Sequence, residues 1–128
     1  MIVVDVNVLA YLFIDGPQTA EVQALREQDP EWAAPLLWRS EWRSIMTGYL
    51  RRGDLDRALA LQMTETASRL LRGREYPVEQ EAVLDVVLGS SLSASDAEYV
   101  ATARRLVVPL YTYDGQILNT FPDVARRP

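Results

Sequence analysis

Short apolar runs rich in β-branched residues alternate along this chain with longer segments of helical periodicity. The first run is Ile-Val-Val-Asp-Val at residues 2–6, which is typical of a buried parallel strand in its length and composition. Parallel strands need long crossover connections, and helices supply them while covering both faces of the sheet. The alternation therefore predicts an α/β fold, a three-layer α/β/α sandwich with a mainly parallel central sheet.

Turn and capping residues set the expected bounds of the elements. We expect a long helix that opens at Pro35, because proline is tolerated in a first helical turn, and that stops at Gly53. Ser93 is a candidate N-cap for a helix that carries Asp96 and reaches residue 106. The other expected helices span residues 8–14, 19–27, 55–71, 79–88 and a short stretch after residue 114; the other expected strands span 32–34, 75–78 and 107–112.

The residue types that are missing restrict the chemistry. The chain has no His, no Cys and no Lys, and all 13 basic residues are Arg. Nucleophile–histidine triads, histidine-pair acid–base catalysis, lysine-dependent phosphate loops, Schiff bases and His/Cys zinc sites are therefore excluded. Without an organic cofactor, the remaining tools are carboxylates, hydroxyls, arginines and a bound hard cation such as Mg²⁺ or Mn²⁺.

Length and charge set looser bounds. We interpret residues 1–128 as a single domain, since one hydrophobic core suffices at this size. No apolar run approaches the roughly 20 residues that cross a bilayer, and the amino terminus lacks the basic flank of a signal peptide. We therefore expect a cytoplasmic protein with no membrane contact. The net charge of −5 argues against a protein that coats nucleic acid non-specifically, but it does not exclude a nuclease.

Two acids interrupt apolar segments. Asp5 lies in the first strand, where an ionised carboxylate is costly unless something compensates it; alternatively, it is a strand-end acid that caps the next helix. Glu41 has Leu37 and Ile45 as its i±4 neighbours, so it breaks an apolar stripe of its helix. A salt bridge to a neighbouring arginine is as good an explanation for Glu41 taken alone.

Two further acids have ordinary local explanations when they are taken singly. Asp96 lies in a first helical turn, where the helix dipole favours a carboxylate, and Asp114 precedes Gly115 in an expected turn. However, Asp5 and Asp114 both lie near carboxyl ends of expected parallel strands, where open α/β sheets place their ligand crevices. The two helical acids can lean into the same crevice. Four close carboxylates repel one another, and a divalent cation such as Mg²⁺ or Mn²⁺ relieves that repulsion.

These acids also carry a family resemblance. The stretch Val-Asp-Val-Asn-Val-Leu at residues 4–9 resembles the opening motif of PIN-domain nucleases, particularly the VapC-like toxins of VapBC type II toxin–antitoxin pairs. Glu41, Asp96 and Asp114 follow in that family's order and approximate spacing, so the resemblance spans nearly the whole chain. Many relatives carry a further acid just after the fourth one, where this chain has Gly115 and Gln116, and we therefore expect one firmly bound ion.

The resemblance implies a magnesium-dependent endoribonuclease. Asp5, Asp96 and Asp114 are its implied metal ligands for Mg²⁺, with Mn²⁺ as a possible substitute, and Glu41 completes the catalytic set. The ion would activate a water that attacks phosphorus, and Glu41 or Asp96 would orient or deprotonate this water. The groups implied to fix the carboxylates are Asn7 and Thr112, and those that could touch RNA phosphates are Arg39 and Arg43.

The same resemblance implies an antitoxin protein as partner and a homodimer. Three alternatives stay open: a PIN fold that has lost catalysis and serves as an interaction module, a non-toxin RNA-processing nuclease, and a phosphoryl-transfer protein with its aspartate after the first strand. The last usually employs a lysine, which this chain lacks. Neither the RNA cleaved nor the antitoxin can be read from the sequence.

Overall fold

The computed structural model describes all 128 residues as five strands and seven helices. The strands are β1 (Ile2–Val4), β2 (Trp32–Pro35), β3 (Glu75–Tyr76), β4 (Leu110–Tyr111) and β5 (Ala125–Arg126). The helices are α1 (Val6–Tyr11), α2 (Thr19–Gln28), α3 (Trp38–Arg52), α4 (Arg57–Leu70), α5 (Gln80–Leu88), α6 (Ala94–Leu106) and α7 (Gly115–Thr120). No helix combines the length and the apolar composition that a membrane span needs.

All strands run parallel, in the order β3-β2-β1-β4-β5. The central strand β1 pairs on both sides, with Val3 opposite Ala33 of β2 and opposite Leu110 of β4. From β1 the chain continues to β2 on one side and later returns to β4 on the other. The strand order therefore reverses between β1 and β4, and this reversal is where open α/β sheets bind ligands beyond the carboxyl ends of their strands.

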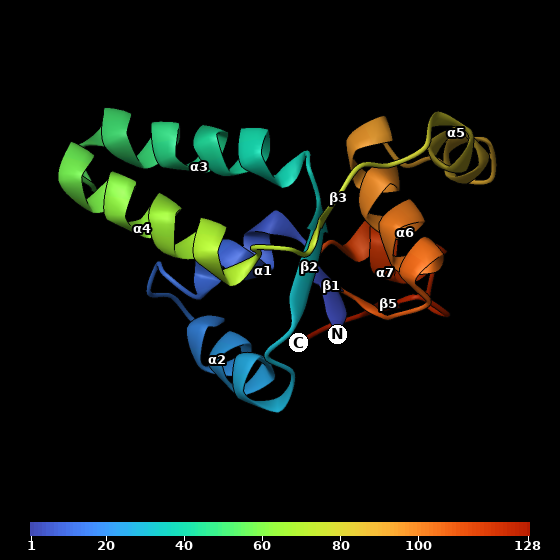
Figure 1. Ribbon diagram of the computed structural model, residues 1–128, viewed down its shortest axis with the longest axis horizontal. Coiled ribbons are helices and arrows are strands. Elements are labelled where there is room, and N and C mark those ends of the chain that lie inside the picture. Colours follow the sequence, from blue (N-terminus) through green and yellow to red (C-terminus); the bar gives the residue numbers. More distant parts are fainter.

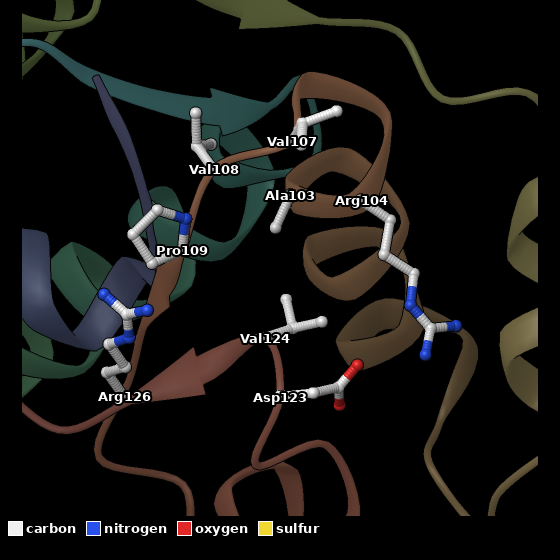
Figure 2. Close-up of a pocket in the computed structure, with 8 residues that line it drawn as sticks. All are labelled: Ala103, Arg104, Val107, Val108, Pro109, Asp123, Val124 and Arg126. Carbon is white, nitrogen blue, oxygen red and sulfur yellow. The ribbon is translucent and has the colours of Figure 1, made fainter.

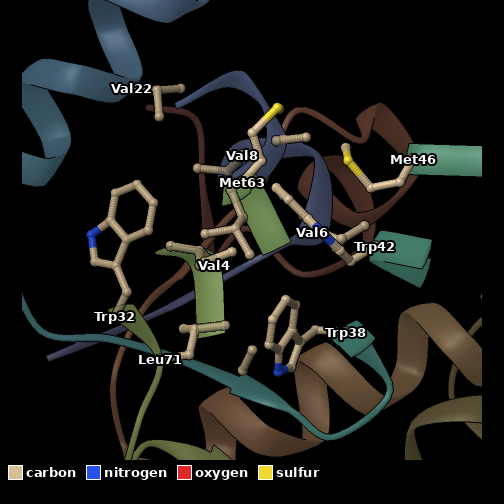
Figure 3. Close-up of a cluster of buried hydrophobic side chains, with 14 of the residues drawn as sticks. Val4, Val6, Val8, Val22, Trp32, Trp38, Trp42, Met46, Met63 and Leu71 are labelled. Carbon is tan, nitrogen blue, oxygen red and sulfur yellow. The ribbon is translucent and has the colours of Figure 1, made fainter. Parts of the chain in front are cut away.

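Helices cover both faces of the sheet (Figure 1). Side chains alternate along β1, so Ile2 and Val4 enter one core while Val3 enters the other. The first core packs the sheet against α1, α2, α3 and α4, and three buried tryptophans (Trp32, Trp38 and Trp42) fill much of it (Figure 3). The second core packs the opposite face against α5, α6 and α7. The three-layer α/β/α prediction is confirmed.

Several expected bounds were wrong. Pro35 ends β2 and does not open the following helix, which begins at Trp38; Ala34 and Leu36 donate the hydrogen bonds to the β3 edge, so this edge does not need the N–H that proline lacks. The strand expected at residues 107–112 contains only β4, because Val107 still closes α6 with a left-handed backbone (φ 56°). Strand β5 was not predicted at all.

The remaining bounds were right within one or two residues, except that α1 ends at Tyr11 and not at residue 14. Helix α1 begins at Val6, two residues earlier than expected, because Asp5 caps it. Gly53 closes α3 with the left-handed backbone (φ 77°) that glycine adopts without strain, as its position predicted. Ser93 caps α6 as predicted, and its hydroxyl accepts a hydrogen bond from the backbone N–H of Asp96.

Candidate functional site

Asp5 stands where β1 ends and α1 begins. The residue is 7% exposed, and its carboxylate is held from two sides: Oδ1 accepts from the backbone N–H of Asn7 at 3.4 Å, and Oδ2 accepts from the Thr112 hydroxyl at 2.8 Å. The first contact makes Asp5 the N-cap of α1, so the capping explanation is correct. Capping does not remove the cost of burying the charge, because no basic group contacts this carboxylate.

Thr112 and Asp114 reach the same place from β4. Thr112 is fully buried just beyond the strand, and its Oγ1 also accepts from the backbone N–H of Asp114 at 3.0 Å. Asp114 caps α7, with Oδ1 accepting from Ile117 N at 2.9 Å. A single hydroxyl therefore connects the acids that follow β1 and β4, across the reversal of strand order. Thr112 thus fixes Asp5 as expected, whereas Asn7 does so through its backbone and its side chain is exposed.

Glu41 lies in the first turn of α3 and Asp96 in the first turn of α6. The Tyr99 hydroxyl, one turn along α6 from Asp96, donates to Glu41 Oε1 at 2.6 Å. Glu41 forms no ion pair, so the salt-bridge explanation for it was wrong. Tyr99 is 1% exposed; burial, followed by the hydrogen bond to Glu41, raises the pKa of its hydroxyl and keeps it a proton donor.

The electrostatics show that these acids share one environment. Burial is the main cause that raises the pKa of Asp5, Glu41 and Asp96. The neighbouring charges add to it: Asp96 and Asp114 act on Asp5, Asp5 and Asp96 act on Glu41, and Asp114 acts on Asp96. No basic residue offsets any of the three shifts. The structure thus brings together two acids that follow β1 and β4 and two acids of α3 and α6 in a negative region, which we call the acid site (Asp5, Glu41, Asp96 and Asp114).

The acid site is open rather than a finished metal cage. No group of three or more acidic side chains is arranged so that it could hold a metal ion directly. Mg²⁺ commonly keeps several of its waters and binds proteins through only one or two carboxylates, so one or two acids of this site could hold a hydrated ion. The donor set, which is oxygen alone, matches a hard cation and excludes a soft one.

Arg39 and Arg43 lie on the α4 side of α3, although both flank Glu41 in sequence. They line a pocket of about 320 Å³ with Thr64 and Ser68 of α4. Arg39 also donates two hydrogen bonds to Glu75 of β3, from Nε to Oε1 at 2.7 Å and from Nη2 to Oε2 at 2.8 Å. A side chain two positions away on a helix is rotated by about 200° around the helix axis. Arg39 and Arg43 are each two positions from Glu41, so neither lies on the same side of α3 as Glu41. Their contact with RNA phosphates stays a prediction.

A second hollow of about 340 Å³ lies elsewhere, between the end of α6 and β5; Asp123 lines it, but none of the four acids of the acid site does (Figure 2). Arg104 and Arg126 stand on opposite sides of it, and Arg104 lies over the Phe121 ring with its guanidinium carbon 4.8 Å from the ring centroid. We assign no role to this hollow.

Comparison with solved structures identifies the fold. A chain of a toxin–antitoxin complex from Klebsiella pneumoniae is 22% identical, with a TM-score of 0.74 over 100% of this chain and 98% of that chain. FitAcB from Neisseria gonorrhoeae is 20% identical, with a TM-score of 0.73 over 100% and 97%. PAE2754 from Pyrobaculum aerophilum is 22% identical, with a TM-score of 0.75 over 97% and 81%. The chain has a PIN-like fold. No protein-family model and no curated relative matches the sequence.

Two residues beside the acid site escaped the sequence analysis. Tyr99 and Glu98 follow Asp96 on α6; Glu98 adds its charge to those that raise the pKa of Glu41, and burial raises its own pKa. Tyr99 could have been predicted from the sequence. Residues three positions apart lie on the same face of a helix, so Tyr99 shares the face of Asp96. No comparable signal pointed to Glu98.

Proposed function

We propose that this chain is a magnesium-dependent endoribonuclease and the toxin subunit of a type II toxin–antitoxin pair. The observation that carries the proposal is the acid site: carboxylates from four separate elements gather beyond the sheet at its reversal of strand order, with no basic group to neutralise them. Structural ion-pair networks also perturb pKa values, but they contain cations, which this site lacks. The shared fold with a chain of the Klebsiella toxin–antitoxin complex supports the toxin role.

Asp5, Asp96 and Asp114 would hold Mg²⁺ or Mn²⁺, partly through water, with Glu41 at the rim of the site. When bound, such an ion polarises a phosphodiester oxygen and lowers the pKa of a coordinated water. Because the resting carboxylates form no finished cage, at least one of them must contact the ion through water or move toward it.

The chain's own groups then supply orientation and proton transfer. Thr112 and the backbone of Asn7 hold the two oxygens of Asp5, so this carboxylate cannot rotate away from the site. Asp114 is fixed by its capping contact with α7. Glu41 has one oxygen on Tyr99 and no other protein hydrogen bond, so its second oxygen can accept a proton from the attacking water. Arg39 and Arg43 are proposed to contact RNA phosphates outside the acid site.

The partners follow from the same proposal. An antitoxin that inserts a basic or polar segment into the acid site would neutralise charges that the chain itself leaves unpaired. A homodimer is proposed alongside it. Non-toxin RNA processing and a catalytically inactive interaction module are the outcomes against which the proposal must be tested.

A cleavage assay tests the activity. We expect RNA to be cut in the presence of Mg²⁺ and not in EDTA, and Asp5→Asn to lower the rate by about 100-fold or more, because it removes a proposed metal ligand. Asp123→Asn is the matched control, because it makes the same exchange at an exposed acid outside the acid site. Full activity of Asp5→Asn, or cleavage in EDTA, would overturn the nuclease proposal. Growth arrest on expression, relieved by a co-expressed neighbouring small protein, separates a toxin from a processing enzyme.

A further inference from the structure

We propose that Tyr99 is the positioning residue for Glu41, a role that rests on the proposed nuclease function and concerns the same site. Its hydroxyl fixes one carboxylate oxygen and thereby directs the other toward the water that attacks the phosphodiester. The proposal stands on the contact between the two side chains and on where that contact lies in the fold.

The contact joins the two helical layers. Trp38 and Trp42, on either side of Glu41 in α3, belong to the core on one face of the sheet, whereas Tyr99 of α6 belongs to the core on the other. The hydroxyl reaches Glu41 Oε1 at 2.6 Å, although the two residues are 58 positions apart in sequence. Tyr99 is 1% exposed, so its ring is held by packing and the direction of its O–H bond is restricted.

The chemistry of the pair assigns distinct tasks to the two carboxylate oxygens. A tyrosine O–H donates a single hydrogen bond, and here it is directed at Oε1 of a half-buried carboxylate. No other protein group hydrogen-bonds this carboxylate, so without Tyr99 the Glu41 side chain would be free to change rotamer. A glutamate that must meet a water within hydrogen-bond reach loses rate when its rotamer is not fixed.

The alternative is that the contact only ties α3 to α6. The chain contains a pair with the same chemistry for comparison: the Tyr113 hydroxyl donates to Glu21 Oε2 at 2.9 Å, on the exposed surface. That pair also connects distant elements, but neither Tyr113 nor Glu21 belongs to the acid site. A purely structural tie predicts that loss of the Tyr99 hydroxyl lowers stability without a specific loss of kcat, whereas positioning predicts a loss of kcat for Tyr99 and none for Tyr113.

The test removes each hydroxyl by Tyr99→Phe and Tyr113→Phe and measures kcat and KM for RNA cleavage together with the thermal midpoint. We expect Tyr99→Phe to lower kcat by about 10-fold to 100-fold with KM unchanged, as is typical for groups that orient catalytic residues. Tyr113→Phe should leave both constants unchanged. A crystal structure of Tyr99→Phe should show the Glu41 carboxylate displaced or in more than one rotamer, a readout that needs no activity.

A double mutant separates positioning from structure. In a Glu41→Gln background, Tyr99→Phe should cause no further loss of kcat, because the group that it positions has already lost its function. A full additional loss, or wild-type kcat in Tyr99→Phe beside an impaired Glu41→Gln, overturns the inference and leaves the nuclease proposal intact. If Tyr99→Phe does not fold, a crystal structure of the wild type supplies the test: Glu41 should occupy one rotamer with Oε1 on the Tyr99 hydroxyl, and a broken contact or several rotamers overturns the inference. A wild-type protein that cleaves no RNA overturns both.

Discussion

Two carboxylates of this protein, Glu75 of β3 and Glu41 of α3, each accept a hydrogen bond from an aromatic side chain, but their electrostatic surroundings differ. Glu75 of β3 accepts from the Trp38 indole at 2.6 Å and is clamped by Arg39, and the hydrogen bond from Arg39 is the main cause that lowers its pKa. Glu41 accepts from Tyr99 at a similar distance but has no cation, and burial raises its pKa. The difference lies in whether the fold supplies a positive group.

Glu75 needs no external ligand, because Arg39 compensates its charge within the protein. The Glu75 cluster (Glu75, Trp38 and Arg39) satisfies the charge within the protein and connects β3 to α3. The acid site contains no positive group that compensates its charges. Burying such charges costs free energy, and a structural role does not require that cost. Buried charges without a compensating group concentrate at binding sites, because the ligand supplies the opposite charge. The comparison therefore separates a structural acid from acids that await a ligand.

The largest expected effect is stabilisation by a divalent cation, which supplies the positive charge that the acid site lacks. We expect Mg²⁺ or Mn²⁺ to raise the free energy of unfolding of the wild type by about 2.7 kcal/mol at 100 times its dissociation constant, by mass action. Asp5→Asn should abolish most of this gain, while Glu75→Gln should keep it. Thermal unfolding at constant ionic strength, with Na⁺ as the control cation, measures both. Equal gains in Asp5→Asn and the wild type would place the ion elsewhere.

A smaller effect should appear without any ion. Asp5→Asn removes a buried charge that has only acidic charges around it, and the amide oxygen can still accept from Thr112 or from the Asn7 backbone. We expect the metal-free variant to be more stable at neutral pH, by about 1 kcal/mol, while it loses activity. Urea unfolding in EDTA measures the change. A variant that is clearly less stable than the wild type would show that the Asp5 charge serves the fold.

Much of this comparison was accessible from the sequence. The β-branched run of β1 predicted a buried strand, and an acid at its end predicted a crevice residue, because strand ends and helix caps are local features. Asp96 and Asp114 have local signals of the same kind, but they were predicted as site residues only together with the other acids and through the family resemblance. The order of the strands, however, depends on pairings between distant segments, and β5 is too short to show a period of its own.

What the sequence could not give is which side chains meet across the fold. Arg39 is near Glu41 in sequence, yet it pairs with Glu75, 36 positions away. Glu41 instead receives the hydroxyl of Tyr99, from the opposite helical layer. Such choices follow from the direction in which each helix face points after packing, and no window of neighbouring residues contains that information. The partners of the acids therefore had to come from the structure.

The smallest effect concerns pH and the Glu75 cluster. Because the pKa of Glu75 is lowered from its ordinary value of 4.5, its ionised form is favoured in the folded state. The stability that this provides is fully present above pH 4.5 and is lost as the pH falls through the lowered value. Urea unfolding at stepped pH should therefore show that Glu75→Gln is less stable than the wild type near neutrality and that the gap closes in acid. Solvent screens the exposed Arg39, so the gap should be small. Arg39→Gln should show the same pH trend, whereas a gap that does not change with pH would mean that packing, not charge, makes Glu75 structural.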